Sequence, residues 1–321
     1  MTTLLALAAA LPLYRATWDG RAPRSLAEAP FVTPWNWRRL VDRRPGRSLR
    51  QPPALWALHP IPGDDPIWTP HAHEDIAAAA RRARAVFREA GIRPGDVVLS
   101  IAPEGPWVAN ALPFLLAAAD SLIPDLPPLG VQVFPLSALT VAFKADLTVF
   151  PFAQMPSVLV GAAADIRAVA DLAQRAGVPP LHCRLLLLLG PPPEAESLAQ
   201  VAETVVPLLH LPGTIAPFGG HPGSAGVWLP AAVVSADVIP DEEWGRALQH
   251  PAYVPPAVPV AAALGTTGEL VVSLANQALP IVRLRTQERV RVVEVGADGA
   301  YVVPLGSRSV ASSPQVLRLQ G

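Results

Sequence analysis

A short run of histidine and acidic residues is the first place where this chain could do chemistry. It reads His71-Ala72-His73-Glu74-Asp75. Imidazole and carboxylate groups bind transition metals, and an extended backbone would place both histidines on one face. A helix that begins here would instead use the two acidic side chains to stabilise the positive end of its dipole. We expect the helix N-terminus, and a metal site is the alternative.

The only cysteine, Cys183, limits redox and metal chemistry. One cysteine excludes an intrachain disulfide and a cysteine-rich metal site. Because the apolar run of residues 185–189 follows it, we expect a buried and inert thiol. The alternative is a reactive thiol, which would need a lowered pKa.

Charge and composition exclude several classes of partner. The 321 residues carry a formal net charge of −1, which does not favour a nucleic acid or an anionic membrane surface. The apolar stretches fall short of the roughly 20 residues that span a bilayer, so we expect a cytoplasmic protein without a transmembrane segment. The sequence also lacks a Gly-x-Ser-x-Gly nucleophile turn and a Rossmann glycine set.

The hydrophobic pattern predicts the elements that must position these residues. Residues 74–90 carry apolar side chains at three- and four-residue spacing, and Gly91 follows as the C-cap of this helix. Further helices are expected at residues 1–13, 107–119, 138–145, 161–177 and 194–209. Apolar strands are expected between them at residues 97–102, 121–124, 147–150, 185–189 and 214–218.

Helices that alternate with continuous apolar strands indicate an α/β fold, with a mostly parallel sheet covered by helices. Beyond residue 225 the pattern changes to strands separated by turns, at residues 227–239, 269–274, 280–295 and 301–305. This change predicts an antiparallel β subdomain near the C-terminus. We therefore expect an α/β core over residues 1–224 and a β-rich subdomain over residues 225–321.

Three ordered motifs carry a family resemblance. The strand Gly268-Glu269-Leu270-Val271 precedes Pro280-Ile281-Val282-Arg283-Leu284-Arg285-Thr286. The helix of residues 74–90 leads into Gly91-Ile92-Arg93-Pro94-Gly95-Asp96, and Tyr14-Arg15 lies near the start. In this order the motifs resemble the large domain of the phenylacetate–CoA ligase branch of the adenylate-forming superfamily. The resemblance implies the fold of these enzymes and, where their chemistry is kept, AMP-forming acid–CoA ligase activity.

The phosphate-binding loop that the resemblance implies is replaced in this chain. In the family, a loop rich in Ser, Thr and Gly holds the ATP phosphates before the helix. Residues 59–69 instead contain three prolines, Gly63 and the acidic pair Asp64-Asp65. Proline removes N–H donors and a carboxylate repels phosphate, so we do not expect ATP to be held in the usual way. Gly265-Thr266-Thr267-Gly268 resembles such a loop but precedes a strand, and we interpret it as a β-turn.

Two further motifs define a degenerate AMP-like pocket. The resemblance implies an aromatic residue near adenine and, four residues later, a glutamate that binds Mg²⁺. Here Phe218 is the aromatic residue and Pro222 takes the place of the glutamate, so no metal site is expected. Glu288 stands at the ribose-binding aspartate, and the alternative is a solvated residue in a charged hairpin. The candidate AMP-contacting residues are Phe218, Gly219, Gly220, His221, Arg285 and Glu288.

The catalytic lysine of the family comes from a C-terminal domain that we expect this chain to lack. Its only lysine, Lys144, lies mid-chain, so an acyl-phosphate transition state would lack its counter-charge. We predict a pseudoenzyme without catalytic residues that acts in binding or complex assembly. One alternative is a residual binding module for an aromatic acid, an acyl group or a nucleotide (AMP or ATP). The other is a ligase subunit that needs a separate chain with the lysine domain.

A protein partner or a second copy of the chain is also expected. Charged residues make up 16% of the sequence, against about 25% in a typical soluble domain. Trp18, Trp35, Trp37 and Trp56 crowd the N-terminal segment, and tryptophan is enriched in interfaces. The alternative is that these side chains fill the core beneath long loops.

Overall fold

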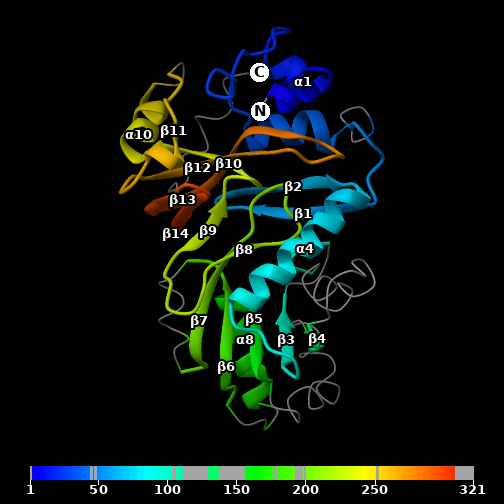
Figure 1. Cartoon of the computed structure of the whole chain (residues 1–321), viewed down its shortest axis with the longest axis vertical. Coiled ribbons are helices and arrows are strands. Elements are labelled where there is room, and N and C mark those ends of the chain that lie inside the picture. Colours follow the sequence, from blue (N-terminus) through cyan, green and yellow to red (C-terminus); the bar gives the residue numbers. More distant parts are fainter. Residues whose placement is uncertain are drawn as a thin grey trace. The chain divides into compact units, whose positions relative to one another are not determined.

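The computed structural model divides the chain into two compact units, shown with the whole chain in Figure 1. Unit 1 combines Met1–Ala72 with Leu229–Gly321, and unit 2 is His73–Trp228. The structure describes residues 2–43, 46, 49–102, 106–110, 129–136, 156–175, 177, 180–191, 198, 200–250 and 253–307. No helix within these ranges is both long enough and apolar enough to cross a membrane.

Unit 2 is built on a six-stranded sheet with the order β4-β3-β5-β6-β7-β8. Its strands are β3 (Val97–Ile101), β4 (Gln132–Leu136), β5 (Val158–Ala162), β6 (Cys183–Leu189), β7 (Ala202–Leu209) and β8 (Phe218–Gly219). All neighbouring pairs are parallel except β7 and β8, which are antiparallel. The expected mostly parallel sheet is therefore confirmed.

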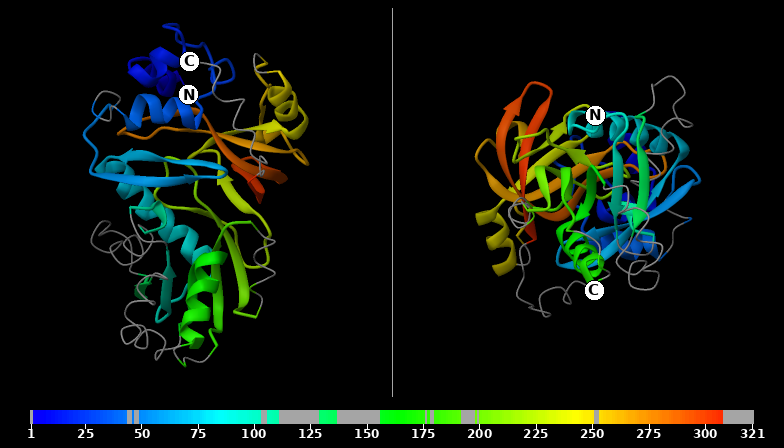
Figure 2. Two further views of the ribbon diagram at one scale, coloured as in Figure 1. Left: turned by 180° about the vertical axis from the view of Figure 1, so that it is seen from behind. Right: turned by 90° about the horizontal axis from the view of Figure 1, so that it is seen from below.

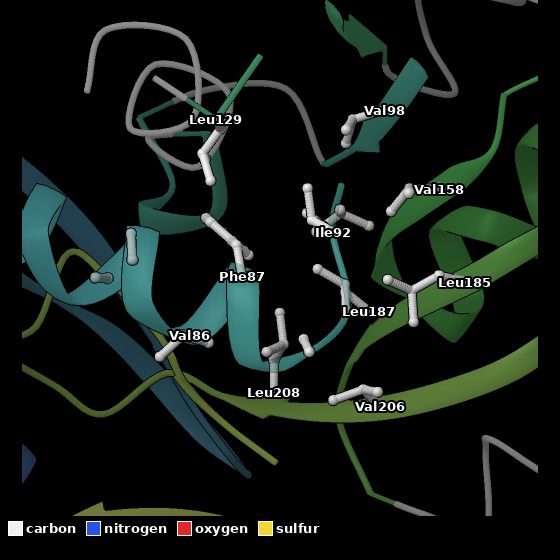
Figure 3. Close-up of a cluster of buried hydrophobic side chains, with 14 of the residues drawn as sticks. Val86, Phe87, Ile92, Val98, Leu129, Val158, Leu185, Leu187, Val206 and Leu208 are labelled. Atoms are coloured by element: carbon white, nitrogen blue, oxygen red, sulfur yellow. The ribbon is translucent and has the colours of Figure 1, made fainter. Parts of the chain in front are cut away.

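Two helices cover the opposite faces of this sheet because successive strand residues point to opposite sides. On one face, α4 (His73–Glu89) packs on Val98, Val158 and other buried residues of the sheet, as the close-up in Figure 3 shows. On the other, α8 (Ala163–Arg175) packs on Leu99 and Leu159, and it lies in front of the sheet in the left view of Figure 2. Both faces of the sheet are covered, so successive residues of a strand are buried on opposite sides, which explains why the strands are continuous apolar runs in the sequence.

Several expected elements of unit 2 differ from the structure. The helix expected at residues 194–209 is wrong, because residues 202–209 form strand β7 and pair in parallel with β6. Its β-branched residues Thr204, Val205 and Val206 favour a strand. Of the strand expected at residues 214–218, only Phe218 is in one. Strands β4 and β5 were not predicted from the sequence.

Some expected elements lie largely outside the described residues. They are the helices at residues 107–119 and 138–145 and the strands at residues 121–124 and 147–150. Within the first of these, the structure describes one short 3₁₀ turn, Val108–Asn110.

A second six-stranded sheet has the order β11-β10-β12-β13-β14-β9. Its strands are β9 (Val227–Pro230), β10 (Ser235–Pro240), β11 (Val258–Pro259), β12 (Thr267–Leu274), β13 (Ile281–Gly296) and β14 (Gly299–Ser307). The pairings from β11 through β14 are antiparallel, which confirms the expected β-rich part. Helix α10 (Asp241–Gln249) interrupts it and was missed, although Pro240 and three acidic residues mark its first turn.

The N-terminal segment of the chain belongs to unit 1, not to the expected core of residues 1–224. It forms α1 (Thr2–Ala9), α2 (Pro12–Thr17), α3 (Pro34–Trp37), the π-helical turn η1 (Arg38–Asp42) and the strands β1 (Leu55–Ile61) and β2 (Asp64–His71). The buried Tyr14 hydroxyl donates to the carbonyl of Pro280 over 2.6 Å and accepts from the N–H of Val282 over 2.9 Å. Val32 forms a parallel bridge to Leu284. These bonds explain the division, because they attach the segment to β13.

We predict that Tyr14→Phe destabilises unit 1. The substitution leaves a buried carbonyl and a buried N–H without a partner, which costs about 1–3 kcal/mol of unfolding free energy. Urea unfolding followed by circular dichroism measures this loss. The matched control is Tyr253→Phe, whose hydroxyl donates to Glu243 in a partly exposed position and whose loss should cost within about 0.5 kcal/mol. Equal losses in the two variants would contradict the role of Tyr14.

Candidate functional site

The segment expected to replace the phosphate loop is a tight β-hairpin in unit 1. Strands β1 and β2 pair antiparallel, and Ile61 is registered with Asp64, so only Pro62 and Gly63 form the turn. Gly63 has a φ of +73°, which favours glycine. Proline has no N–H, so the turn offers one backbone donor, whereas a phosphate-binding nest presents several in succession.

The carboxylate of Asp64 is held by donors of unit 1. The Nη2 of Arg38 donates to its Oδ1 over 2.8 Å, and the Nε2 of Gln287 donates to its Oδ2 over 3.2 Å. The backbone N–H of Asp65 adds a third bond, of 2.7 Å, to Oδ1. The Asp64 carboxylate therefore connects the hairpin to η1 and β13.

Glu288 is a half-buried carboxylate on β13, where it is registered with Ser307 of β14. Burial raises the pKa of its carboxyl group to about 7, and no cation in the described chain counteracts this effect. Its backbone N–H donates to the Thr286 hydroxyl over 3.1 Å. A carboxylate in this state can accept hydrogen bonds from ligand hydroxyl groups, since no ion pair saturates it.

Arg285 is already engaged by a neighbouring strand. Its Nε donates to both carboxylate oxygens of Glu269, over 3.1 Å each, and Glu269 is only 6% exposed. Two positions later, Gln287 has a φ of +59°, and its N–H donates to Glu269 Oε1 over 3.2 Å. The left-handed conformation costs a non-glycine residue about 1–2 kcal/mol. In return, the glutamine side chain contributes the bond to Asp64.

The aromatic–glycine motif lies in unit 2, where packing explains most of its residues. Phe218 is 1% exposed, and the guanidinium of Arg82 lies 5.1 Å from its ring centroid. A Cβ at Gly219 would lie 2.5 Å from a side-chain atom of Val86, and one at Gly220 would lie 2.3 Å from a backbone oxygen. His221 is exposed, and its Nδ1 lies 3.1 Å from the carbonyl oxygen of Pro222.

The structure distributes the six candidate residues over two units. Phe218, Gly219, Gly220 and His221 are consecutive in unit 2, whereas Arg285 and Glu288 lie on β13 of unit 1. Stacking of a base on Phe218 and ribose binding at Glu288 therefore stay predictions.

Two polar residues near these motifs were not anticipated from the sequence. The role of Arg38 could not be predicted, because the sequence around it has no hydrophobic periodicity. Arg82 is a charged residue among the polar positions of α4, yet it lies three residues after buried Ala79 and four before buried Val86. That spacing puts it on the same stripe as the apolar residues and could have identified it.

The remaining sequence candidates have structural roles. Helix α4 begins at His73 with Glu74 and Asp75 in its first turn, as expected. His71 is buried, with its Nε2 3.0 Å from the Thr69 hydroxyl, and the described part of the chain contains no group of three or more potential metal ligands. Cys183 is also buried, and burial raises its pKa to about 11, which fits the expected inert thiol.

Asp96 closes the Gly-x-x-Pro-Gly-Asp turn that follows α4. It accepts hydrogen bonds of 2.7 Å each from the Arg93 N–H, the Ser157 hydroxyl and the Arg184 guanidinium. Burial acts to raise the pKa of Asp96, but these bonds outweigh it and hold the pKa below its ordinary value. The motif is therefore a structural junction of unit 2.

No protein-family model and no curated protein matches this sequence, but solved structures do. A 2-hydroxyisobutyryl-CoA ligase in the postadenylation state with R3-HIB-AMP has a TM-score of 0.68 at 16% identity, over 95% of this chain and 66% of that chain. An open conformation of this ligase with 2-HIB-AMP and CoA gives 0.67 at 18% identity, over 95% and 72%. The acyl acid amido synthetase AtGH3.15 with 2,4-DB gives 0.60 at 12% identity, over 95% and 68%.

These matches show that the chain has the fold of adenylate-forming enzymes, which the ordered motifs indicated. The chain covers 66% of the length of the first ligase structure. At identities below 20% the likeness concerns the fold alone, so function must be argued from the site. The closer resemblance to the phenylacetate–CoA ligase branch stays a prediction.

We predict that Glu288→Gln stabilises the protein at high pH. The folded carboxyl group keeps its proton to about pH 7, whereas in the unfolded chain it ionises near its ordinary value of 4.5. Stability is therefore fully present below that value and falls as the pH rises through 7. The variant should be more stable than the wild type by about 1–2 kcal/mol at pH 8, after allowance for partial exposure, and the difference should shrink at pH 5.

Urea unfolding at the two pH values measures this difference. Glu294→Gln on the exposed side of the same strand is the matched control, and its effect should be the same at both pH values. A Glu288→Gln effect that does not change with pH would exclude a raised pKa in the folded protein.

Proposed function

We propose that this protein is a non-adenylating member of the adenylate-forming fold, which binds a ligand or a partner instead of activating an acid. The two-residue turn Pro62-Gly63 between β1 and β2 is the observation that carries the proposal. A loop that holds three phosphates needs consecutive N–H donors, and this turn has one.

The charge at the turn supports the same conclusion. Asp64 places a carboxylate next to the turn, and Arg38 and Gln287 point their donors at it. A nucleotide phosphate would have to displace this carboxylate from its donors or approach it against charge repulsion. Both routes oppose the binding of ATP through its phosphates.

Other parts of adenylation chemistry also lack their usual residues. Pro222 stands where a glutamate would bind Mg²⁺, and a proline side chain offers no ligand. His221 is exposed nearby, but a single imidazole is a poor ligand for this hard cation. The only lysine, Lys144, lies outside the described residues. We infer that no lysine of the described chain neutralises a charged transition state.

The residues that remain suit a ligand without a triphosphate. Glu288 is a half-buried carboxylate that can accept hydrogen bonds from the two hydroxyl groups of a ribose. AMP, or an aromatic or acyl acid, is therefore the class of ligand that we propose. The alternative is a split ligase, in which a separate chain supplies the lysine domain.

We predict that the purified chain does not catalyse carboxylate-dependent exchange of pyrophosphate into ATP. The assay uses labelled pyrophosphate with ATP, Mg²⁺ and a panel of aromatic and aliphatic acids. Exchange above background with any acid, by this chain alone, would refute the proposal. Exchange that appears only after a second chain from the same cell is added would favour the split ligase.

Calorimetry on the same preparation provides the complementary measurement. AMP should bind no more weakly than ATP with Mg²⁺, because Asp64 opposes the additional phosphates. The Glu288→Ala variant should weaken AMP binding, while the exposed Glu294→Ala variant should leave it unchanged. Much tighter binding of ATP than of AMP would contradict the role of the hairpin.

Complex assembly is the second candidate function, and exposed apolar residues of unit 1 favour it. Trp18 and Trp37 are buried and fill the core, which restricts the interface interpretation to the other tryptophans. Trp35 is 38% exposed, with the guanidinium of Arg39 5.3 Å from its ring centroid, and Val254 is 72% exposed. Aromatic and arginine side chains together are typical of interface anchors.

We predict that the protein associates with itself or with a partner at micromolar concentration. Light scattering should give a mass above the 33.8 kDa of one chain, or a second protein should co-purify from its own cell. Trp35→Ala should weaken the association, whereas Trp37→Ala should lower stability instead, because Trp37 is fully buried. A stable monomer without any co-purifying protein would exclude assembly as the function.

A further inference from the structure

Arg82 of helix α4 is a half-buried cation that pairs with no carboxylate of the described residues. Its Nη2 donates to the carbonyl oxygen of Ala216 over 3.3 Å, and its guanidinium lies 5.1 Å from the Phe218 ring centroid. Its Nε is buried and makes no hydrogen bond. All of these residues belong to unit 2.

Other partly buried arginines in the described chain form ion pairs with carboxylates. Arg184 pairs with Asp96 over 2.7 Å, Arg285 with Glu269, and Arg289 with Asp241 over 2.6 Å. Each guanidinium thus has an anion at hydrogen-bond distance. Arg82 has a carbonyl and an aromatic ring, which compensate only part of the cost of removing a full charge from water.

The titratable residue His210, which senses the charge of Arg82, does not supply the missing negative charge. His210 is buried, and its Nε2 lies 3.2 Å from the carbonyl oxygen of Ile215. Burial, with a smaller contribution from the charge of Arg82, lowers the pKa of His210 to about 4, so the ring is neutral near pH 7. The neutral imidazole of His210 therefore neither balances the charge of the Arg82 guanidinium nor repels it.

These observations point to an external anion. A planar guanidinium binds a carboxylate or a phosphate through two parallel N–H donors, and charge-assisted bonds of this kind are the strong ones in proteins. The Nε of Arg82 is a donor without a partner, and because Arg82 as a whole is only half-buried, a solute can reach part of its side chain.

We propose that Arg82 binds a small oxyanion, a carboxylate or a phosphate group, beside β8 in unit 2. The proposal uses only residues of unit 2 and does not depend on the hairpin or on Glu288. It assigns the Arg82 charge to ligand binding, because within the described residues its partners are a carbonyl group and an aromatic ring.

Stabilisation of the folded protein by added anions tests the proposal. Benzoate and inorganic phosphate are the two probes, titrated at constant ionic strength with chloride as the balancing anion, and the thermal midpoint is measured. A ligand that binds only the folded state raises the midpoint in proportion to its saturation. Stabilisation by benzoate alone assigns a carboxylate ligand, and stabilisation by phosphate alone assigns a phosphate ligand.

Arg82→Met is the decisive variant, and Arg81→Met, which removes an exposed arginine from the preceding position of the same helix, is its matched control. Arg82→Met should weaken anion binding by about tenfold to a hundredfold, whereas Arg81→Met should retain it. Without added anion, Arg82→Met should be at least as stable as the wild type, because an uncompensated charge has been replaced by an apolar chain of similar length.

Two results would overturn the proposal. One is the absence of any anion-specific stabilisation of the wild type, and the other is equal stabilisation of the wild type and Arg82→Met. If Arg82→Met fails to fold, the charge is structural, and Arg82→Lys then decides the question. That variant keeps the charge without the planar donor pair, so it should fold and bind the anion more weakly than the wild type.

Discussion

The backbone of β13 needs hydrogen-bond partners on both sides, and this requirement organises unit 1. One side pairs with β12 and the other with β14, but near its start the strand relies on the N-terminal segment. The Tyr14 hydroxyl bonds on either side of Ile281, and Val32 exchanges bonds with Arg283 and Arg285. Arg283 has a φ of +49° and its side chain donates to two carbonyls of the same segment. The strand therefore holds together residues that are more than 250 positions apart.

The same strand carries the candidate site of unit 1, so stability and binding share their residues. Arg285 is held by Glu269, Gln287 bonds to the hairpin through Asp64, and Glu288 follows directly. The two-residue turn between β1 and β2 is followed at once by Asp64, whose carboxylate accepts hydrogen bonds from Arg38 of η1 and Gln287 of β13. The bond between Gln287 and Asp64 thus connects the tight turn to the residue of β13 that has a left-handed backbone.

The sequence predicts the regular parts of the fold and misses the parts set by tertiary contacts. The period of α4 and the apolar run of β6 are strong local signals, and both elements lie where expected. Strand β7 was read as a helix because alanine and leucine at its ends favour one, while its β-branched centre pairs with β6. The hairpin could not be foreseen from Asp64 and Asp65 alone, because its stability depends on Arg38 and Gln287, which are distant in the sequence. The spacing of Arg82 places it on the apolar stripe of α4, but its contacts with Ala216 and Phe218 could not be foreseen from that spacing.

A scaffold that had lost all ligand binding would not be expected to keep uncompensated charges. Replacing a buried charged group with an apolar residue of similar volume is often neutral or stabilising, so the fold itself gives no reason to retain Glu288 or Arg82. The described chain nevertheless keeps both groups, a carboxyl whose pKa is raised to about 7 in unit 1 and a guanidinium whose Nε makes no hydrogen bond in unit 2. Structural charges in the same molecule, such as Asp96 and Arg184, are fully paired. The contrast favours ligand binding over a purely structural role, because a ligand is what would compensate these two groups.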